Sequence, residues 1–384
     1  MSLARSICVL VALGTLMSTP VVAQTALAQA EPEVAPKLDG DADKDGIIDG
    51  ARTWDAAAAE QEPTPTDGSA DADHLIVSIG DSVASGEGNP DAGAGFFRRA
   101  RWLNGPCHRS MLSGAAQVAL QIERGERASA VTFVPLGCSG ATIDRGLLGD
   151  YGGIAPEPGR TFRPQVDLVN ALARRREIDA LLLSVGANDL GFSKIVRFCI
   201  KLPDCSERRF DPDDPTREAD DPTAPSLETW VEGALADLAD GYDELDESLG
   251  ERLPRKRVVA VEYFDSTRGP DGFCPMFANS VTREESEWAH RNVLLPLNEA
   301  FAAAALRHGW TFVSGVAEEF AEHGLCARGD RWVVTPVGSL SRHDELTGAR
   351  LAGTLHPNEA GHLATARLIR PALAGVLGAS VDVS

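Results

Sequence analysis

The sequence predicts an α/β protein of three layers, in which helices cover both faces of a central parallel sheet. Short apolar segments alternate with longer amphipathic ones along most of the chain. The clearest apolar segment, residues 180–185, reads Ala-Leu-Leu-Leu-Ser-Val and is almost continuously apolar. Such runs are typical of strands buried on both faces, as in parallel sheets, and alternation with helices is the pattern of a three-layer fold.

The expected strands share a short apolar run that ends near a turn-forming residue, and they are residues 75–79, 131–134, 180–185, 257–261 and 311–313. The expected helices lie between and after these strands, around residues 113–124, 164–175, 226–249, 282–307 and 359–377. Ser226 and Thr282 are suitable N-caps, and Glu285 follows Thr282 at capping-box spacing. Residues 201–224 are rich in proline and aspartate, which indicates a long surface insertion.

Composition excludes several classes of protein. The chain has 384 residues, of which 43% are hydrophobic, so it can bury a core and is not disordered throughout. Its 57 acidic and 36 basic residues give a formal charge of -21, which repels phosphate backbones, so we expect no nucleic-acid partner. No stretch approaches 18 uninterrupted apolar residues, so no stable membrane span is expected.

The first 30 residues have the pattern of a secretory signal. Arg5 supplies the positive start, and residues 7–17 form an apolar stretch broken only by Gly14 and Thr15. Small residues then allow cleavage after Ala23 or after Ala30. We therefore expect an exported, extracellular protein.

Residues 31–73 are interpreted as an acidic, low-complexity linker, because they hold 13 acidic residues against 3 basic ones. Within the linker, carboxylates recur at the spacing of a calcium loop, with Gly46 at the turn and ligands at Asp41, Asp43, Asp45 and Asp49. The twelfth position is Arg52 rather than the glutamate of an EF-hand. A structural calcium site and a solvated acidic linker both remain open.

The cysteine count agrees with export. Cys8 lies in the signal, and six cysteines remain in the mature chain, at positions 107, 138, 199, 205, 274 and 326. An even number in an exported chain favours three disulfides, and no spacing typical of a zinc site is present. Fifteen pairings are possible, of which pairing in sequence order is the simplest.

A candidate nucleophile follows the first expected strand. The segment Gly80-Asp81-Ser82 stands where open α/β sheets place their sites, just beyond the carboxyl end of a strand. The segment lacks the last glycine of a G-x-S-x-G elbow, since Ala84 occupies that position, and it lacks the Gly-Lys-Ser/Thr of a phosphate loop. Glu87 lies in the same segment, and the sequence assigns no role to it.

Three further segments lie at strand ends or helix starts. Gly140 ends the segment Gly-Cys-Ser-Gly after the second strand, Asn188 and Asp189 follow the third strand, and His356 precedes the last helix. A serine, an imidazole and preorganised N–H donors are what acyl transfer requires. Because carboxyl ends of parallel strands meet at one edge of a sheet, we expect these residues to converge.

The four segments resemble the SGNH, or GDSL, hydrolases, and the match covers roughly residues 74–370 in the family's order. The resemblance is to the secreted actinobacterial esterase and lipase branch. It implies a flavodoxin-like α/β/α domain over 74–384 and serine-dependent ester hydrolysis without a cofactor. Ser82 is then the nucleophile and His356 the general base, while the N–H groups of Ser82 and Gly140 and the Asn188 amide form the oxyanion hole. It also implies three disulfides in sequence order, Cys107–Cys138, Cys199–Cys205 and Cys274–Cys326.

One departure from the family affects the histidine. Many members have an aspartate three residues before it, and this chain has Gly353. We expect the Gly353 carbonyl to accept the Nδ1–H of His356 and to fix its tautomer, with Asp344 or Glu345 as the alternative. The remaining histidines match no catalytic block, and they are expected at the surface or in packing; they are His74, His108, His290, His308, His323, His343 and His362.

The sequence therefore predicts a secreted serine esterase or lipase that acts on a lipid or another small ester. A carbohydrate acetyl esterase is the alternative within the enzyme class. A non-enzymatic alternative is a calcium-binding surface or adhesion protein built on a catalytically retired hydrolase scaffold, which the loss of an acid at Gly353 would favour. Retention of all four catalytic segments argues against retirement.

Overall fold

A computed structural model describes residues 72–92, 100–125, 129–343 and 348–378. All of them belong to the second of the two compact units of the chain, Lys37–Ser384. The signal expected at residues 1–30, the calcium loop from Asp41 to Asp49, and Asp344 lie outside the described residues. Only the last two residues of the acidic segment are described, and they already belong to the first strand.

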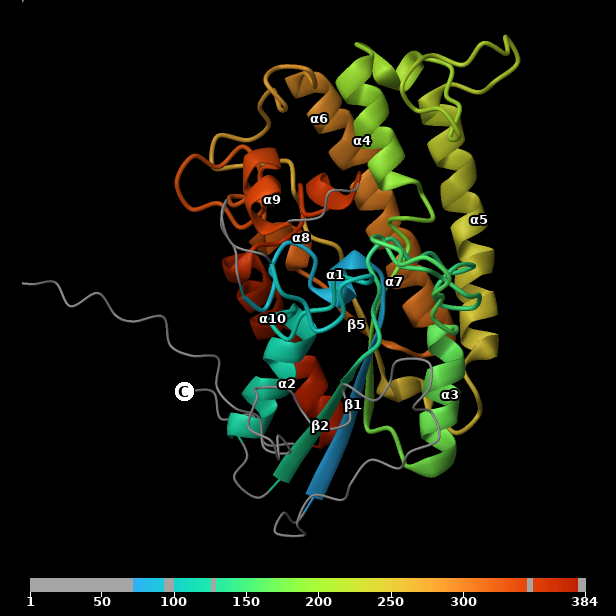
Figure 1. Ribbon diagram of the computed structural model, residues 1–384, viewed down its shortest axis with the longest axis vertical. Coiled ribbons are helices and arrows are strands. Elements are labelled where there is room, and N and C mark those ends of the chain that lie inside the picture. The colour runs from blue at the N-terminus through green and yellow to red at the C-terminus, as the bar shows by residue number, and fades with distance from the viewer. Residues whose placement is uncertain (1–71, 93–99, 126–128, 344–347, 379–384) are drawn as a thin grey trace, which may run out of the picture. The chain divides into compact units, whose positions relative to one another are not determined.

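The central sheet contains five parallel strands in the order β2-β1-β3-β4-β5 (Figure 1). The strands are β1 (Ala72–Gly80), β2 (Ser129–Pro135), β3 (Ala180–Ser184), β4 (Val258–Val261) and β5 (Thr311–Val313). All five match expected strands to within about three residues, so the predicted parallel sheet is confirmed. The strand order reverses between β1 and β3, and ligands of open α/β sheets bind beyond the carboxyl ends of the strands at such a reversal.

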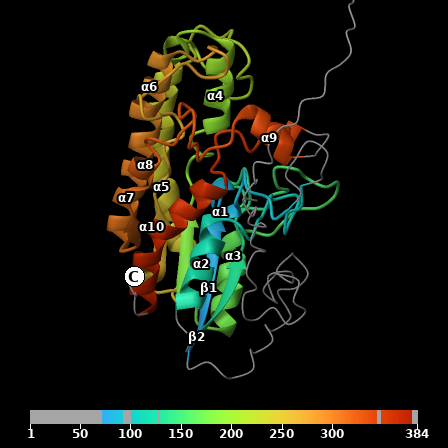
Figure 2. The ribbon, with the colours of Figure 1, turned by 90° about the vertical axis from the view of Figure 1, so that its left-hand side faces the viewer.

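Helices cover both faces of the sheet, and the three-layer prediction is confirmed (Figure 2). On one face lie α2 (Gly114–Gly125) and α10 (Glu359–Leu377), and on the other lie α3 (Gln165–Arg175), α5 (Leu227–Ser248) and α7 (Leu295–His308). Side chains of β1 alternate between the two cores: Ile76 packs with α2 and α10, whereas Val77 and Ile79 pack on the opposite side. This alternation explains why β1 is apolar throughout.

Several shorter helices complete the described fold, and they are α1 (Ser82–Ser85), α4 (Phe192–Lys201), α6 (Arg283–Ala289), α8 (Val316–Glu319) and α9 (Pro336–Arg342). Single 3₁₀ turns lie at Cys205–Glu207, Arg255–Arg257 and Gly348–Leu351. The helical stretch expected around 282–307 is present over Arg283–His308, where a π-helical turn at His290–Leu294 lies between α6 and α7. Pro296 in the first turn of α7 has no N–H to donate to the carbonyl of Asn292, which interrupts the α-helical ladder there.

The predicted caps and cross-links are present. The Ser226 hydroxyl accepts the Thr229 N–H at the start of α5, and Thr282 and Glu285 form a reciprocal capping box at the start of α6. The disulfides follow sequence order, Cys107–Cys138, Cys199–Cys205 and Cys274–Cys326. Among the described helices, none is both long and apolar enough to cross a bilayer.

Candidate active site

The turn after β1 positions Ser82 at the carboxyl edge of the sheet. Gly80 has a φ of +136°, and a Cβ there would lie 1.9 Å from the Ser184 carbonyl oxygen, so only glycine allows β1 and β3 to end this close together. The side-chain amide of Gln165 accepts the Gly80 N–H at 2.8 Å and donates to its carbonyl at 2.9 Å. Asp81 then caps α1 through the Val83 N–H, which places Ser82 in the first turn.

His356 reaches Ser82 from the segment before α10. Its Nε2 atom lies 2.8 Å from the Ser82 hydroxyl oxygen, although 274 residues separate the two in sequence. Gly88 allows this approach, because a Cβ at that position would lie 3.2 Å from the His356 Cβ and 2.6 Å from the Pro357 carbonyl oxygen. The nucleophile turn and the histidine segment therefore pack directly on each other.

The hydrogen bond expected between His356 Nδ1 and the Gly353 carbonyl is not present. That carbonyl instead accepts the main-chain N–H of His356 at 3.0 Å, in a turn that also holds Leu355 at a φ of +67°. Nδ1 is buried and makes no well-aligned hydrogen bond in the described part of the chain, but the backbone of Thr354 and Ala352 lies close enough to raise the pKa of the ring. Burial lowers the pKa of His356 below its ordinary value of 6.5, while the charge on Glu87 acts in the opposite direction.

Three groups expected at an oxyanion hole lie at the same edge of the sheet. Within the described residues, the amide N–H groups of Ser82 and Gly140 donate to no protein acceptor. Gly140 has a φ of +82°, and Tyr151 holds this turn by donating from its hydroxyl to the carbonyl of the preceding Ser139 at 3.1 Å. Asn188 donates one amide hydrogen to the Ala141 carbonyl at 2.9 Å, which orients the group and leaves its second hydrogen for another acceptor.

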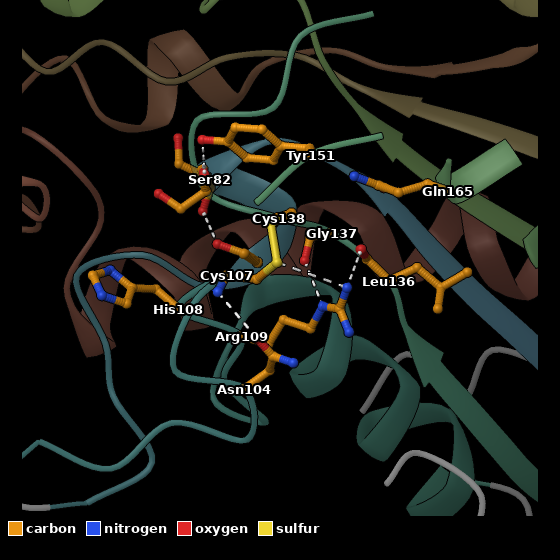
Figure 3. Close-up of a disulfide and its surroundings, with 12 residues drawn as sticks. Ser82, Asn104, Cys107, His108, Arg109, Leu136, Gly137, Cys138, Tyr151 and Gln165 are labelled. Carbon is orange, nitrogen blue, oxygen red and sulfur yellow. Dashed lines mark hydrogen bonds between the residues drawn. A yellow bond between two sulfur atoms is a disulfide. The ribbon is translucent and has the colours of Figure 1, made fainter. Parts of the chain in front are cut away.

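The Cys107–Cys138 disulfide lies beside these groups (Figure 3). Arg109 extends along the disulfide and donates to the carbonyls of Leu136 and Gly137 at 3.1 and 2.8 Å. The segment that leads from β2 to Gly140 is therefore held by a covalent bond and by a buried guanidinium.

Two acidic residues near the site have raised pKa values. Burial raises the pKa of Asp81 to about 7, although it accepts hydrogen bonds from the Tyr263 hydroxyl at 2.5 Å and from Val83 N–H. Burial raises the pKa of Asp189 to about 6; one of its oxygens accepts the Ile143 N–H at 2.9 Å, and the other, Oδ2, is buried without a partner among the described residues. Both support the turns that carry Ser82 and Asn188.

Glu87 lies at the centre of a fully buried polar cluster behind the site. Its Oε2 atom accepts from Ser139 at 2.6 Å and is 2.8 Å from His108 Nδ1, and its Oε1 atom is 2.5 Å from His343 Nε2. Burial alone would raise the pKa of Glu87, but the two histidines outweigh it and hold that pKa well below its ordinary value. The ligand atoms of Glu87, His108 and His343 lie within 4.8 Å of one another, so this trio also has the composition of a metal site.

The other histidine near the cluster has a structural role, as the sequence indicates. His362 is buried, and burial lowers its pKa to about 4. In the neutral ring, Nδ1 accepts the Gly114 N–H at 3.1 Å and Nε2 faces the Glu87 carbonyl oxygen at 3.3 Å. His362 therefore links α10 to α2 and to the nucleophile turn.

A cleft of about 620 Å³ adjoins Asn188. Its lining in the described part of the chain contains three aspartates at 144, 189 and 237, the indole of Trp230, apolar side chains such as Ile143 and Leu238, and no basic residue. The cleft is therefore amphiphilic and negatively charged, and it would repel an anionic ligand.

Sequence reasoning missed the supporting residues Gln165, Tyr151, Tyr263, His108 and His343. These residues lie outside the four catalytic segments, and no repeating sequence pattern links them to the site. Glu87 differs from them because it stands in the nucleophile segment itself, although the sequence assigns no role to it.

The chain belongs to the GDSL-like lipase/acylhydrolase family, which matches residues 78–364. A search of curated proteins found no match. Among solved structures, the extracellular lipase of Streptomyces rimosus is similar in fold, with a TM-score of 0.50 and 19% identity over 79% of this chain and 99% of that one. Phospholipase A1 of Streptomyces albidoflavus has a TM-score of 0.49 and 20% identity, over 79% and 98%. A carbohydrate acetylesterase family member from Sinorhizobium meliloti has a TM-score of 0.38 and 14% identity, over 79% of this chain and 99% of that one.

Proposed function

We propose that this protein is an exported serine hydrolase of carboxylic esters. The observation that carries the proposal is the 2.8 Å contact between Ser82 Oγ and His356 Nε2 at the carboxyl edge of the sheet. A hydroxyl within hydrogen-bond distance of a neutral imidazole is the arrangement of a nucleophile and its general base. Burial favours the neutral form of His356, which is the form that accepts a proton.

The proposed reaction has two halves. Ser82 Oγ attacks the ester carbonyl carbon and passes its proton to His356 Nε2; the tetrahedral intermediate then collapses as the alcohol leaves with that proton. Water next attacks the acyl-enzyme carbonyl, gives a proton to His356, and the acid leaves as Ser82 regains its proton. The N–H groups of Ser82 and Gly140 and the free amide hydrogen of Asn188 hold the oxyanion in both halves.

In this proposal no carboxylate contacts the imidazole. Gly353 stands where many family members have an acid, and the catalytic unit is a Ser82–His356 dyad. The close packing of Gly88 against the histidine segment supports it, because that contact holds the His356 backbone and Cβ beside the nucleophile turn.

The cleft beside Asn188 favours a neutral substrate. Three aspartates and a tryptophan suit an ester whose acyl or alcohol part is uncharged and carries hydroxyl groups, such as an acylglycerol or an acetylated sugar. The apolar side chains between them provide room for a short acyl chain. An ester with a phosphate next to the scissile bond is disfavoured by charge.

The test is covalent labelling and turnover of purified protein. Wild type should hydrolyse p-nitrophenyl acetate or butyrate and should be labelled by an alkyl fluorophosphonate. Ser82→Ala should lose both, with Ser286→Ala, a buried serine on α6 whose hydroxyl donates to the Cys274 and Thr282 carbonyls, as the serine control. Wild type without turnover and without labelling would support the non-enzymatic scaffold instead, and undiminished labelling of Ser82→Ala would remove Ser82 as nucleophile.

A further inference from the structure

The buried cluster around Glu87 connects several segments of the proposed site. The Glu87 N–H donates to the Ser82 carbonyl at 3.0 Å, and its carbonyl faces His362 on α10. Its carboxylate accepts from Ser139, the residue before Gly140, and pairs with His343 at the end of α9. One residue thus contacts the nucleophile turn, the oxyanion turn and the helix that precedes the histidine segment.

The hydrogen bonds of His343 fix where the protons lie. Its Nδ1 atom faces two acceptors, the Ser339 carbonyl at 2.9 Å and the Ser339 hydroxyl oxygen at 3.3 Å; that hydroxyl already donates to the Arg350 carbonyl at 2.9 Å. Nδ1 therefore carries a proton, and a second proton must lie between Nε2 and the Glu87 carboxylate. The Glu87 carboxylate then faces three donors, on Ser139, His108 and His343, in a buried hydrogen-bonded network.

The same geometry argues against a metal in this cluster. Ligand atoms bound to a tetrahedral zinc at about 2.0–2.1 Å lie roughly 3.3 Å apart. The Glu87 oxygens are only 2.8 Å from His108 and 2.5 Å from His343, which are direct hydrogen-bond distances. All three side chains are completely buried, and the indole ring of Trp102 stacks on His108 at 4.6 Å.

We propose that Glu87 is the positioning residue of this active site, which holds the Ser82 and Gly140 turns in register through its bonds to the Ser82 carbonyl and to Ser139. This inference rests on the proposed function. As the imidazole takes up the serine proton, a nearby carboxylate stabilises the resulting cation even without contact.

The charged and titratable groups around His356 come from three segments. Glu87 lies on the nucleophile turn, His343 is the residue that follows α9, and His362 lies on α10. The charge on Glu87 raises the pKa of His356 and that on His343 lowers it, with Glu87 the stronger of the two. Removal of the Glu87 charge should therefore move the acid limb of kcat/KM to lower pH, and removal of the His343 charge should move it to higher pH.

The experiment compares Glu87→Gln with a matched buried carboxylate. Asp265 is also completely buried and accepts from Thr267 and Arg268, but it contacts none of the proposed catalytic residues. Glu87→Gln should lower kcat for a p-nitrophenyl ester by about 10- to 100-fold with KM unchanged, and should move the acid limb of kcat/KM to lower pH. Asp265→Asn should lose stability but keep both kcat and the limb.

Three results would overturn the assignment. One is a Glu87→Gln variant that loses stability as Asp265→Asn does while its kcat and pH limb stay at wild-type values. If Glu87→Gln does not fold, His343→Gln replaces it; its acid limb should move to higher pH, and an unmoved limb counts against the role. The third result is one equivalent of zinc in the purified wild-type protein, measured by elemental analysis.

Failure of the proposed function can be distinguished from failure of the Glu87 assignment, because the wild-type protein itself would then show neither turnover nor phosphonate labelling.

Discussion

The Gly353 carbonyl oxygen accepts the main-chain N–H of His356 at 3.0 Å, and it makes no hydrogen bond with the imidazole Nδ1 atom. The ring is held by its contact with Ser82, and the backbone of Thr354 and Ala352 lies near it on the histidine segment. Burial opposes the charged form of this imidazole more strongly than Glu87 and the neighbouring backbone favour it, so the pKa of His356 is lowered.

The pH dependence follows from this arrangement. Burial lowers the pKa of His356 below 6.5, so the neutral, proton-accepting form persists to lower pH than for an exposed histidine. We expect the acid limb of kcat/KM for a p-nitrophenyl ester to lie below pH 6.5. A limb above that value would mean that a carboxylate stabilises the imidazolium by direct contact.

Asn188→Ala should lower kcat by about 10²- to 10³-fold, the usual effect of deleting one oxyanion donor, with a smaller change in KM. The side chain also bonds to the Ala141 carbonyl, so thermal unfolding of the variant should be measured alongside. Asn170→Ala is the control, because Asn170 makes similar side-chain bonds to Ser248 and Gly250, remote from the proposed catalytic groups. Equal kcat values in the two variants would remove Asn188 from the oxyanion hole.

Asp189→Asn should stabilise the protein above pH 6. The pKa of Asp189 rises from 3.8 to about 6 on folding, so the folded state binds the proton more tightly and stability falls as pH rises through that window. Asparagine keeps an acceptor for the Ile143 N–H and carries no charge. Allowing for partial exposure, we expect a gain of about 1–2 kcal/mol in urea unfolding at pH 8 and little at pH 4. The same gain at both values would contradict the ionisation argument.

The two long-range disulfides should differ in their effect on catalysis. Replacing both cysteines of either Cys107–Cys138 or Cys274–Cys326 by alanine should cost roughly 2–4 kcal/mol of stability. Only loss of Cys107–Cys138 should also lower kcat, by about tenfold or more, because Cys138 is two residues before Gly140. The comparison is made at a temperature where both variants are folded. Equal kcat values would show that the oxyanion turn does not depend on the bond.

Trp230→Ala tests the cleft. Loss of stacking worth about 0.5–1.5 kcal/mol should raise KM for an acetylated sugar by about 3- to 10-fold while kcat is retained. Trp288, whose indole N–H faces Glu228 and which does not line the cleft, provides the control variant Trp288→Ala. A parallel series with glycerol esters and an anionic phospholipid ranks the substrate classes. Faster hydrolysis of the phospholipid than of both neutral esters would contradict the charge argument.

The sheet and the four catalytic segments could be predicted because their signals are local. Apolar runs mark the buried strands, and parallel pairing brings the residues after each strand, such as Ser82 and Asn188, to one edge. Helix α4 was missed, although Ile195, Phe198 and Cys199 show the apolar spacing of a helix and are its buried residues.

The Glu87 cluster could not be predicted, for a different reason. His108 and His343 are 21 and 256 residues from Glu87, and they lie in loops or at a helix end where no periodicity applies. Their meeting depends on how those segments fold over the nucleophile turn, which is a property of tertiary packing alone. The hydrogen bond from His356 Nδ1 to the Gly353 carbonyl was expected wrongly for a related reason. The conformation of the turn before His356 decides which N–H this carbonyl accepts, and that conformation gives no signal in the sequence.

The Cys107–Cys138 bond has a consequence for timing. Thiols stay reduced in a reducing cytosol, and disulfides persist in oxidising compartments. If the chain is an exported hydrolase as proposed, it would acquire its full competence only after export, and the esters of the producing cell would be spared while synthesis is under way.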